Sequence, residues 1–120
     1  MNLTIAGKNL MLSGDWDPTS LVGALFTSGD YTADELTGTG YARQAITYDA
    51  PAGGVLSVDD DNLATFTIPV AAEGETVDFT HAAIYAGATR VGEGAITPQS
   101  YSTGGTYTLN EADITLSDVM

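Results

Sequence analysis

Short segments rich in valine, isoleucine, threonine, tyrosine and phenylalanine alternate along this chain with glycine, aspartate and proline. Such segments are typical of β-strands joined by turns, and no long helical periodicity competes with them. The segments cover residues 21–27, 41–49, 55–58, 63–70, 77–86, 90–97, 106–109 and 113–118. Roughly seven to nine strands at this spacing predict one all-β domain over residues 1–120, an antiparallel β-sandwich of jelly-roll or immunoglobulin-like topology.

Alternation with a period of two is clearest over residues 41–49, where Ile46 and Tyr48 fall on the face opposite Tyr41 and Arg43. We expect residues 77–86 to form the longest strand, with Gly87 turning the chain into its hairpin partner at 90–97. Residues 98–105 are expected to be a loop. The segments 22–26 and 81–85 share a pattern of small, then aliphatic, then aromatic residues. This similarity either marks two central strands of one sheet or arises by chance.

Residues 1–15 are expected to form an N-terminal arm, with a short helix or extended piece at 5–12. Its apolar side chains Ile5, Leu10, Met11 and Leu12 could dock on the sheet. The first eight residues lack a basic stretch followed by a long apolar run, so no secretory signal is expected. No apolar stretch approaches the roughly 20 residues that a membrane-spanning helix needs.

The charge of the chain excludes some partners. Sixteen Asp and Glu stand against three Lys and Arg, which gives a net charge of −13. Binding to nucleic acid or to an anionic membrane is not expected, because both need a basic surface. The acidity suits a solvated surface, a basic partner or a salty environment, and these three explanations stay open. The chain has no cysteine, so it has neither disulfides nor thiolate chemistry.

Candidate catalytic and metal-binding residues are few. His81 is the single histidine, and no Gly-x-Ser-x-Gly turn accompanies it, which favours a structural role for it. The run from Asp59 to Asp61, followed by Asn62, offers oxygen ligands that suit calcium. The run lacks the alternating ligand spacing and closing Glu of a calcium loop, so a solvated turn is the stronger interpretation. We therefore expect no cofactor and no enzymatic activity.

Exposed aromatic and cationic side chains are the best candidates for an interface. Loop aromatics either anchor partners or cap the ends of a sandwich. Arginines are rare here, and each could pair with a carboxylate within the subunit or across an interface. The candidate interface residues are Leu3, Ile5, Leu10, Met11, Trp16, Tyr31, Tyr41, Arg43, Arg90 and Tyr101.

The most distinctive phrase is Gly-Tyr-Ala-Arg-Gln-Ala-Ile-Thr-Tyr at 40–48. With the segments 6–12, 22–27, 66–69 and 77–85, it resembles small structural proteins of tailed-phage virions, which include head decoration (cement), tail and tail-fibre proteins. The resemblance implies no catalytic residues. It implies a capsid decoration protein, assembled in the host cytoplasm, that docks in many copies on the major capsid protein as a homodimer or homotrimer. A tail or tail-fibre component is the first alternative, and a carbohydrate-binding β-sandwich module is the second.

Overall fold

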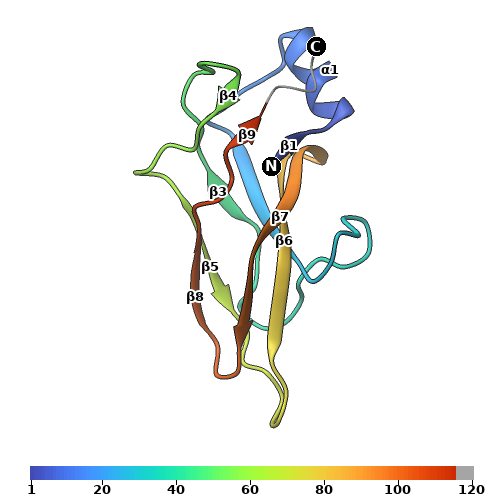
Figure 1. Cartoon of the computed structure of the whole chain (residues 1–120), viewed down its shortest axis with the longest axis vertical. Coiled ribbons are helices and arrows are strands. Elements are labelled where there is room, and N and C mark those ends of the chain that lie inside the picture. The colour runs from blue at the N-terminus through green and yellow to red at the C-terminus, as the bar shows by residue number, and fades with distance from the viewer. Residues whose placement is uncertain (116–120) are drawn as a thin grey trace.

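A computed structural model describes residues 1–115 of the chain, and Figure 1 shows the arrangement of its elements. Within residues 1–115, nine strands and one helix follow in the order β1 (Asn2–Leu3), α1 (Ile5–Ser13), β2 (Leu21–Phe26), β3 (Gln44–Ile46), β4 (Val55–Leu56), β5 (Ala64–Ile68), β6 (Val77–Ala86), β7 (Thr89–Tyr101), β8 (Gly105–Leu109) and β9 (Ile114–Thr115). The predicted all-β domain with a short N-terminal helix is therefore confirmed.

Seven strands form one curled sheet in the order β3-β2-β6-β7-β1-β9-β4. Its described pairs are antiparallel except for β1 and β9, which run parallel, so the sheet is mixed. The sheet curls until its two edges meet. Beyond β3 and β4, Tyr48 forms an antiparallel bridge with Val58, and the Asp49 N–H donates to the Ser57 carbonyl at 2.8 Å. One end of the domain is therefore closed like a barrel.

The second layer is the antiparallel pair of β5 and β8, visible beside the large sheet in Figure 1. Where the β5–β8 pair lies, the large sheet and this pair enclose the core between them. This arrangement gives the domain its sandwich-like character. Across this core the Phe79 ring meets the Tyr107 ring edge-on, with centroids 5.0 Å apart. The division into seven and two strands differs from that of jelly-roll and immunoglobulin sandwiches.

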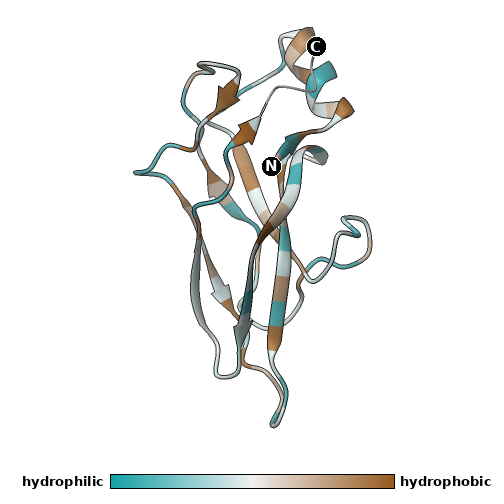
Figure 2. Ribbon diagram, viewed as in Figure 1, coloured by the Kyte–Doolittle hydropathy of each residue, from teal (hydrophilic) through white to brown (hydrophobic). Residues whose placement is uncertain are grey.

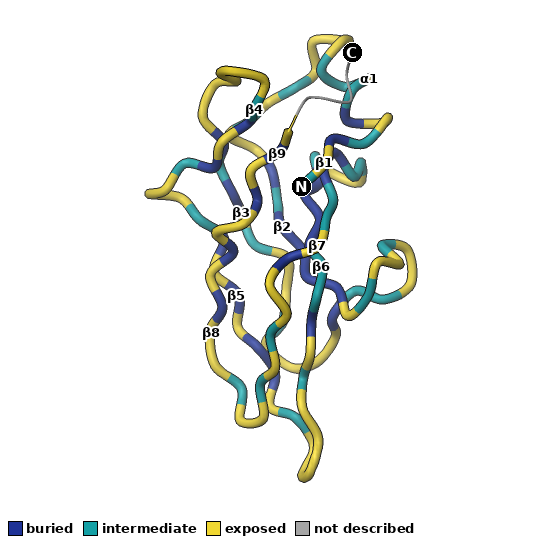
Figure 3. Tube along the Cα trace, viewed as in Figure 1, coloured by how far each residue is buried: buried dark blue, intermediate teal, exposed yellow. Residues whose placement is uncertain are grey.

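The alternation of buried and exposed residues explains why these segments are strands. In β5 the residues Ala64, Phe66 and Ile68 are buried, and the two threonines between them are exposed. β6 has the predicted bounds of residues 77–86 and carries apolar and polar bands in turn (Figure 2). Buried stretches follow the strands, whereas the connecting loops are largely exposed (Figure 3). The segments 22–26 and 81–85, noted for their shared pattern, are paired neighbours in β2 and β6.

Helix α1 begins after Thr4, whose hydroxyl accepts a hydrogen bond from the Gly7 N–H at 2.9 Å, as an N-cap does. It ends at Gly14, whose φ of 83° lies in the left-handed region that favours glycine. Gly7 is buried against β7, so the helix rests on the sheet through its smallest residue. The expectation that Ile5 and Leu12 dock on the sheet is wrong, because both point into solvent.

Two predicted boundaries need correction, and a third lies partly outside the described residues. Residues 41–43 precede β3 and are not part of a strand, because Leu25 on this edge of β2 bonds instead to the Leu36 N–H and to the Tyr41 hydroxyl. The expected loop at 98–105 is wrong in its first part, since β7 continues to Tyr101 and is the longest strand. Pro98 is tolerated there because the β6–β7 ladder shifts register beside it, between Phe79 and His81. Residues 116–118 of the expected last strand lie outside the described residues.

Candidate functional site

The outer face of the large sheet, turned away from the main core, carries a second apolar cluster. On this face β2 and β6 lie side by side, with Val22 opposite Tyr85 and Phe26 opposite His81. The buried members are Ala24, Phe26, Ala83 and Tyr85, with Val22 and Tyr31 packed against them. The sheet is therefore buried on both faces here, and residues from the segment between β2 and β3 lie over its outer side.

Arg43 is held on this outer face by two partners. Its Nη2 and Nε donate to the two carboxylate oxygens of Glu35, at 2.8 and 3.1 Å. Its guanidinium carbon lies 3.9 Å from the centre of the Tyr85 ring, a close cation–π contact. The sequence left open whether Arg43 pairs with a carboxylate within the subunit or across an interface. In the structure it pairs with Glu35 of its own chain. The Arg43 side chain stays 37% exposed.

Tyr41 connects the same ion pair to the sheet. Its hydroxyl donates to Glu35 at 2.9 Å and accepts from the Leu25 N–H at 3.0 Å. Burial would raise the pKa of Glu35, but the hydrogen bonds from Arg43 and Tyr41 outweigh it and hold that pKa below its ordinary value. Burial raises the pKa of Tyr41, so its hydroxyl keeps its proton. Tyr41 itself is partly buried, stacks on Phe66 and packs against the main core.

Arg90 occupies the other side of the same face, on β7 beside Tyr85. Its Nε lies 3.6 Å from a Glu93 carboxylate oxygen, and its guanidinium carbon lies 5.3 Å from the centre of the Tyr31 ring. The Nε atom is buried and has no hydrogen-bond partner. Burial, with the nearby Glu93 carboxylate, raises the pKa of Tyr31. Both arginines of the chain therefore lie on one face of an otherwise acidic molecule.

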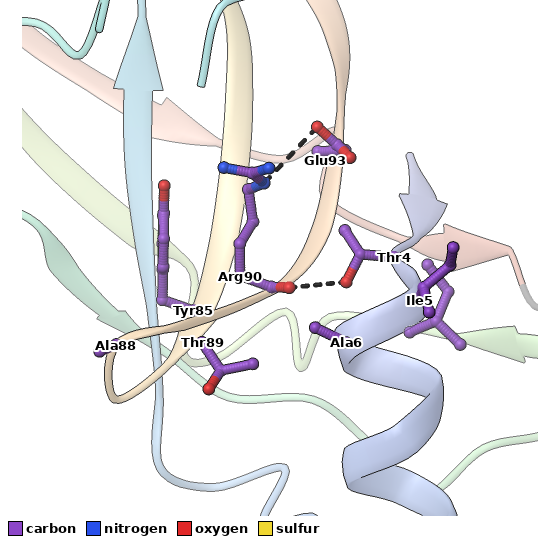
Figure 4. Close-up of a pocket in the computed structure, with 9 residues that line it drawn as sticks. Thr4, Ile5, Ala6, Tyr85, Ala88, Thr89, Arg90 and Glu93 are labelled. Carbon is purple, nitrogen blue, oxygen red and sulfur yellow. Dashed lines mark hydrogen bonds and ion pairs between the residues drawn. The ribbon is translucent and has the colours of Figure 1, made fainter. Parts of the chain in front are cut away.

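A pocket of about 680 Å³ adjoins Arg90, and we call it the hairpin pocket. The start of α1 forms one wall, and the β6–β7 hairpin forms the other, as Figure 4 shows. Its walls include Thr4, Ile5 and Ala6 on the helix side and Tyr85, Ala88 and Arg90 on the hairpin side. The Thr4 hydroxyl donates to the Arg90 carbonyl at 2.6 Å and so ties the two walls together.

The other predicted interface residues are dispersed. Leu3 is buried in β1 and also lines the hairpin pocket. Leu10 and Met11 are residues of α1 that are half-buried against the main core. Trp16 packs on the main core, and its indole N–H is buried without a hydrogen-bond partner. Tyr101 ends β7 and stacks on Phe79 with centroids 5.8 Å apart. These side chains serve the chain's own packing, so the outer face gathers Ile5, Tyr31, Arg43 and Arg90 but not the remainder.

His81 and the aspartate run are tied into local hydrogen bonds. His81 Nδ1 lies 2.7 Å from the Thr80 hydroxyl, and its ring meets Tyr31 edge-on. The Asp59 carboxylate accepts from the Asp61 N–H and the Asn62 amide, as in an Asx turn. Within residues 1–115, no three His, Cys, Asp or Glu side chains are grouped as a metal site would require. No helix in this part of the chain is long and apolar enough to cross a membrane.

Comparisons of the chain with protein-family models, with curated proteins and with solved structures find no match.

Sequence reasoning missed the partners of the two arginines. Glu35 and Tyr31 come from the long loop between β2 and β3, whose path no short pattern specifies. Tyr85 is buried, but its ring also forms the surface on which Arg43 lies. The alternation of side chains along β6 could have indicated this second role of Tyr85, because Tyr85 lies on the face of β6 opposite Ile84, which belongs to the main core.

Proposed function

We propose that this chain is a non-enzymatic structural protein of a tailed-phage virion, and specifically a decoration protein that binds the outer surface of the major capsid shell. One observation carries the proposal. The 40–48 phrase, on which the resemblance to virion proteins depends, supplies Arg43 to the outer face, and Tyr41 of the same phrase donates to Glu35, the ion-pair partner of Arg43. The residues that define the resemblance thus form a fixed surface of the fold.

The composition of this face supports a role in protein binding. Tyrosine and arginine are enriched in the energetically important parts of protein interfaces, because they combine a large contact area with directional hydrogen bonds. Here two arginines lie on tyrosine rings and are oriented before any partner arrives. Such preorganisation lowers the entropy lost on binding.

Stabilisation of a shell would come from many such contacts. A domain with extents of 47 × 28 × 22 Å can touch neighbouring capsid subunits at once. Each contact adds buried area between subunits, and the contacts act together because one rigid domain makes them. No chemical step is needed, and the major capsid protein is the proposed partner.

Copy number in purified particles tests this proposal. Quantitative mass spectrometry would measure the ratio of this protein to the major capsid protein. We expect hundreds of copies in a simple ratio to the capsid subunit. A handful of copies would instead assign the protein to the tail or tail fibre, and absence from particles would overturn both virion assignments and favour a binding module.

A further inference from the structure

The middle of β7 contains a stretch of main chain that the sheet does not pair. The β6–β7 ladder shifts register between Phe79 and His81, and residues 96–98 of β7 have no register partner there. On the other side of β7, strand β1 pairs only with Gly92 and Glu93. In the described part of the chain, no strand therefore supplies register partners for residues 96–98. Main-chain N–H and C=O groups left in this way need other hydrogen-bond partners.

Side chains satisfy this main chain in place of a strand. The two carboxylate oxygens of Glu111 each lie 3.1 Å from the Thr97 main-chain nitrogen and accept from its N–H. One of these oxygens also accepts from the Thr97 hydroxyl at 2.9 Å. The Gln99 side-chain amide donates to the Thr97 carbonyl at 3.1 Å, and Pro98 has no N–H to satisfy. Both main-chain groups of Thr97 are thus occupied by side chains of the same molecule.

The sequence around these contacts carries no charge. Residues 94–110 contain no Asp, Glu, Lys or Arg, although the whole chain has a net charge of −13. They are rich in threonine and tyrosine and include Ile96, and all three residue types favour β-pairing. Charge repulsion, which keeps acidic chains apart, is weakest over such a stretch. Glu93 and Glu111 flank it on either side, and charges in such flanking positions limit pairing between chains.

We propose that Glu111 is a guard residue, whose carboxylate occupies the Thr97 N–H and so keeps the unpaired part of β7 from pairing with a second molecule. A strand that approaches residues 96–98 has to displace a charge-assisted hydrogen bond before it can form its own. Gln99 has the corresponding role at the Thr97 carbonyl. This proposal does not depend on the proposed virion role, because it concerns the free chain in solution, whereas copy number is measured in particles.

Two substitutions at one position separate the hydrogen bond from the charge. Glu111→Ala and Glu111→Gln both remove one negative charge, but the Gln side chain keeps an oxygen that can accept from the Thr97 N–H. Sedimentation velocity from about 10 µM to about 1 mM measures self-association. We expect Glu111→Ala to associate at concentrations about tenfold or more below those that Glu111→Gln needs. Equal association of the two variants, or none in either, would overturn the proposal.

Amide hydrogen exchange, measured by NMR, locates the contact between molecules. In dilute, monomeric Glu111→Ala the Thr97 N–H should exchange faster than in the parent protein, because its acceptor is gone. The same N–H should become protected again as the concentration rises, because it then finds an acceptor in a second molecule. Association without renewed protection of Thr97 would mean that another surface makes the contact, and the proposal would fail.

Tyr41→Phe is the control for a general loss of stability. It removes the hydroxyl that bonds to Leu25 and Glu35, and it leaves Glu111 and Thr97 unchanged. Circular dichroism and the melting temperature establish the folded fraction of each variant under the conditions of sedimentation. If Tyr41→Phe associates as strongly as Glu111→Ala at the same folded fraction, association follows from unfolding and Glu111 is not a guard.

Discussion

The guanidinium carbon of Arg43 lies 3.9 Å from the centre of the Tyr85 ring, while the Glu35 carboxylate accepts hydrogen bonds from two of its nitrogens. The contact joins residue 43, just before β3, to the middle of the large sheet. It also adds a side-chain contact to the long loop after β2, whose backbone is bonded to β2 beside Glu35 by the Leu36 N–H and the Leu25 carbonyl at 2.9 Å. One side chain therefore contacts both the long loop and the large sheet.

Replacing Arg43 with lysine keeps the charge but removes the second donor and the planar group that covers Tyr85. Because the pair is partly solvated, we expect a loss of about 1 kcal/mol in the free energy of unfolding. Urea denaturation measures it. A double-mutant cycle with Glu35→Gln should give a coupling energy clearly above zero, and additive losses would mean that the ion pair contributes nothing to the fold.

Tyr41→Phe removes the hydroxyl that serves both Leu25 and Glu35. The Leu25 N–H is then left without its partner inside the fold, and we expect a loss of about 1–3 kcal/mol in the free energy of unfolding. Tyr101→Phe is the matched control, because its hydroxyl makes a single exposed bond to the Thr106 carbonyl. Equal losses in the two variants would contradict the role given to Tyr41.

Glu35 makes part of the stability depend on pH. Its pKa in the folded chain lies below its ordinary value of 4.5, so its contribution is complete above that value. The contribution disappears as the pH falls through the lowered pKa of the folded state. Protonation of the other acids affects the parent protein and Glu35→Gln alike. The difference between their free energies of unfolding therefore reports on Glu35 alone. Urea unfolding from about pH 6 to about pH 3 should show that difference shrinking as the pH falls, and a constant difference would contradict the assignment.

Gly7→Ala tests how closely α1 rests on β7. A Cβ on Gly7 would lie 2.5 Å from the Val91 carbonyl oxygen, so the helix would have to shift. We expect a loss of about 1–3 kcal/mol in the free energy of unfolding, although alanine favours helices more than glycine does. Asn9→Ala, on the exposed side of the helix, should be neutral or stabilising. A stabilised Gly7→Ala variant would mean that the helix can move away from the sheet at little cost.

Strand positions could be predicted from the sequence because burial in this fold follows a period of two. The segment 77–86 is an example, and so is β5 with its alternating threonines. The pairing of strands could not be predicted in the same way. β1 lies between β7 and β9, and this arrangement depends on contacts between the two ends of the chain rather than on local pattern.

The candidate site could be predicted only in part. Scarcity of cations drew attention to Arg43 and Arg90, and both do lie on the outer face. Their partners could not be found, since Glu35 and Tyr31 belong to a loop whose course depends on the folded sheet beneath it. Ile5 and Leu12 were expected to be buried because they are apolar, whereas the helix turns its glycine to the sheet instead.

The bridge between Tyr48 and Val58 leaves the closed end of the large sheet with no free edge. Unpaired strand edges are templates on which other chains can add strands, and this is a common route to aggregation. The open edges lie at the other end of the domain. There Pro69 directly follows β5, and Pro98 lacks the N–H with which another residue of β7 could donate a hydrogen bond. These features disfavour the pairing of sheets between molecules that are crowded side by side at high local concentration.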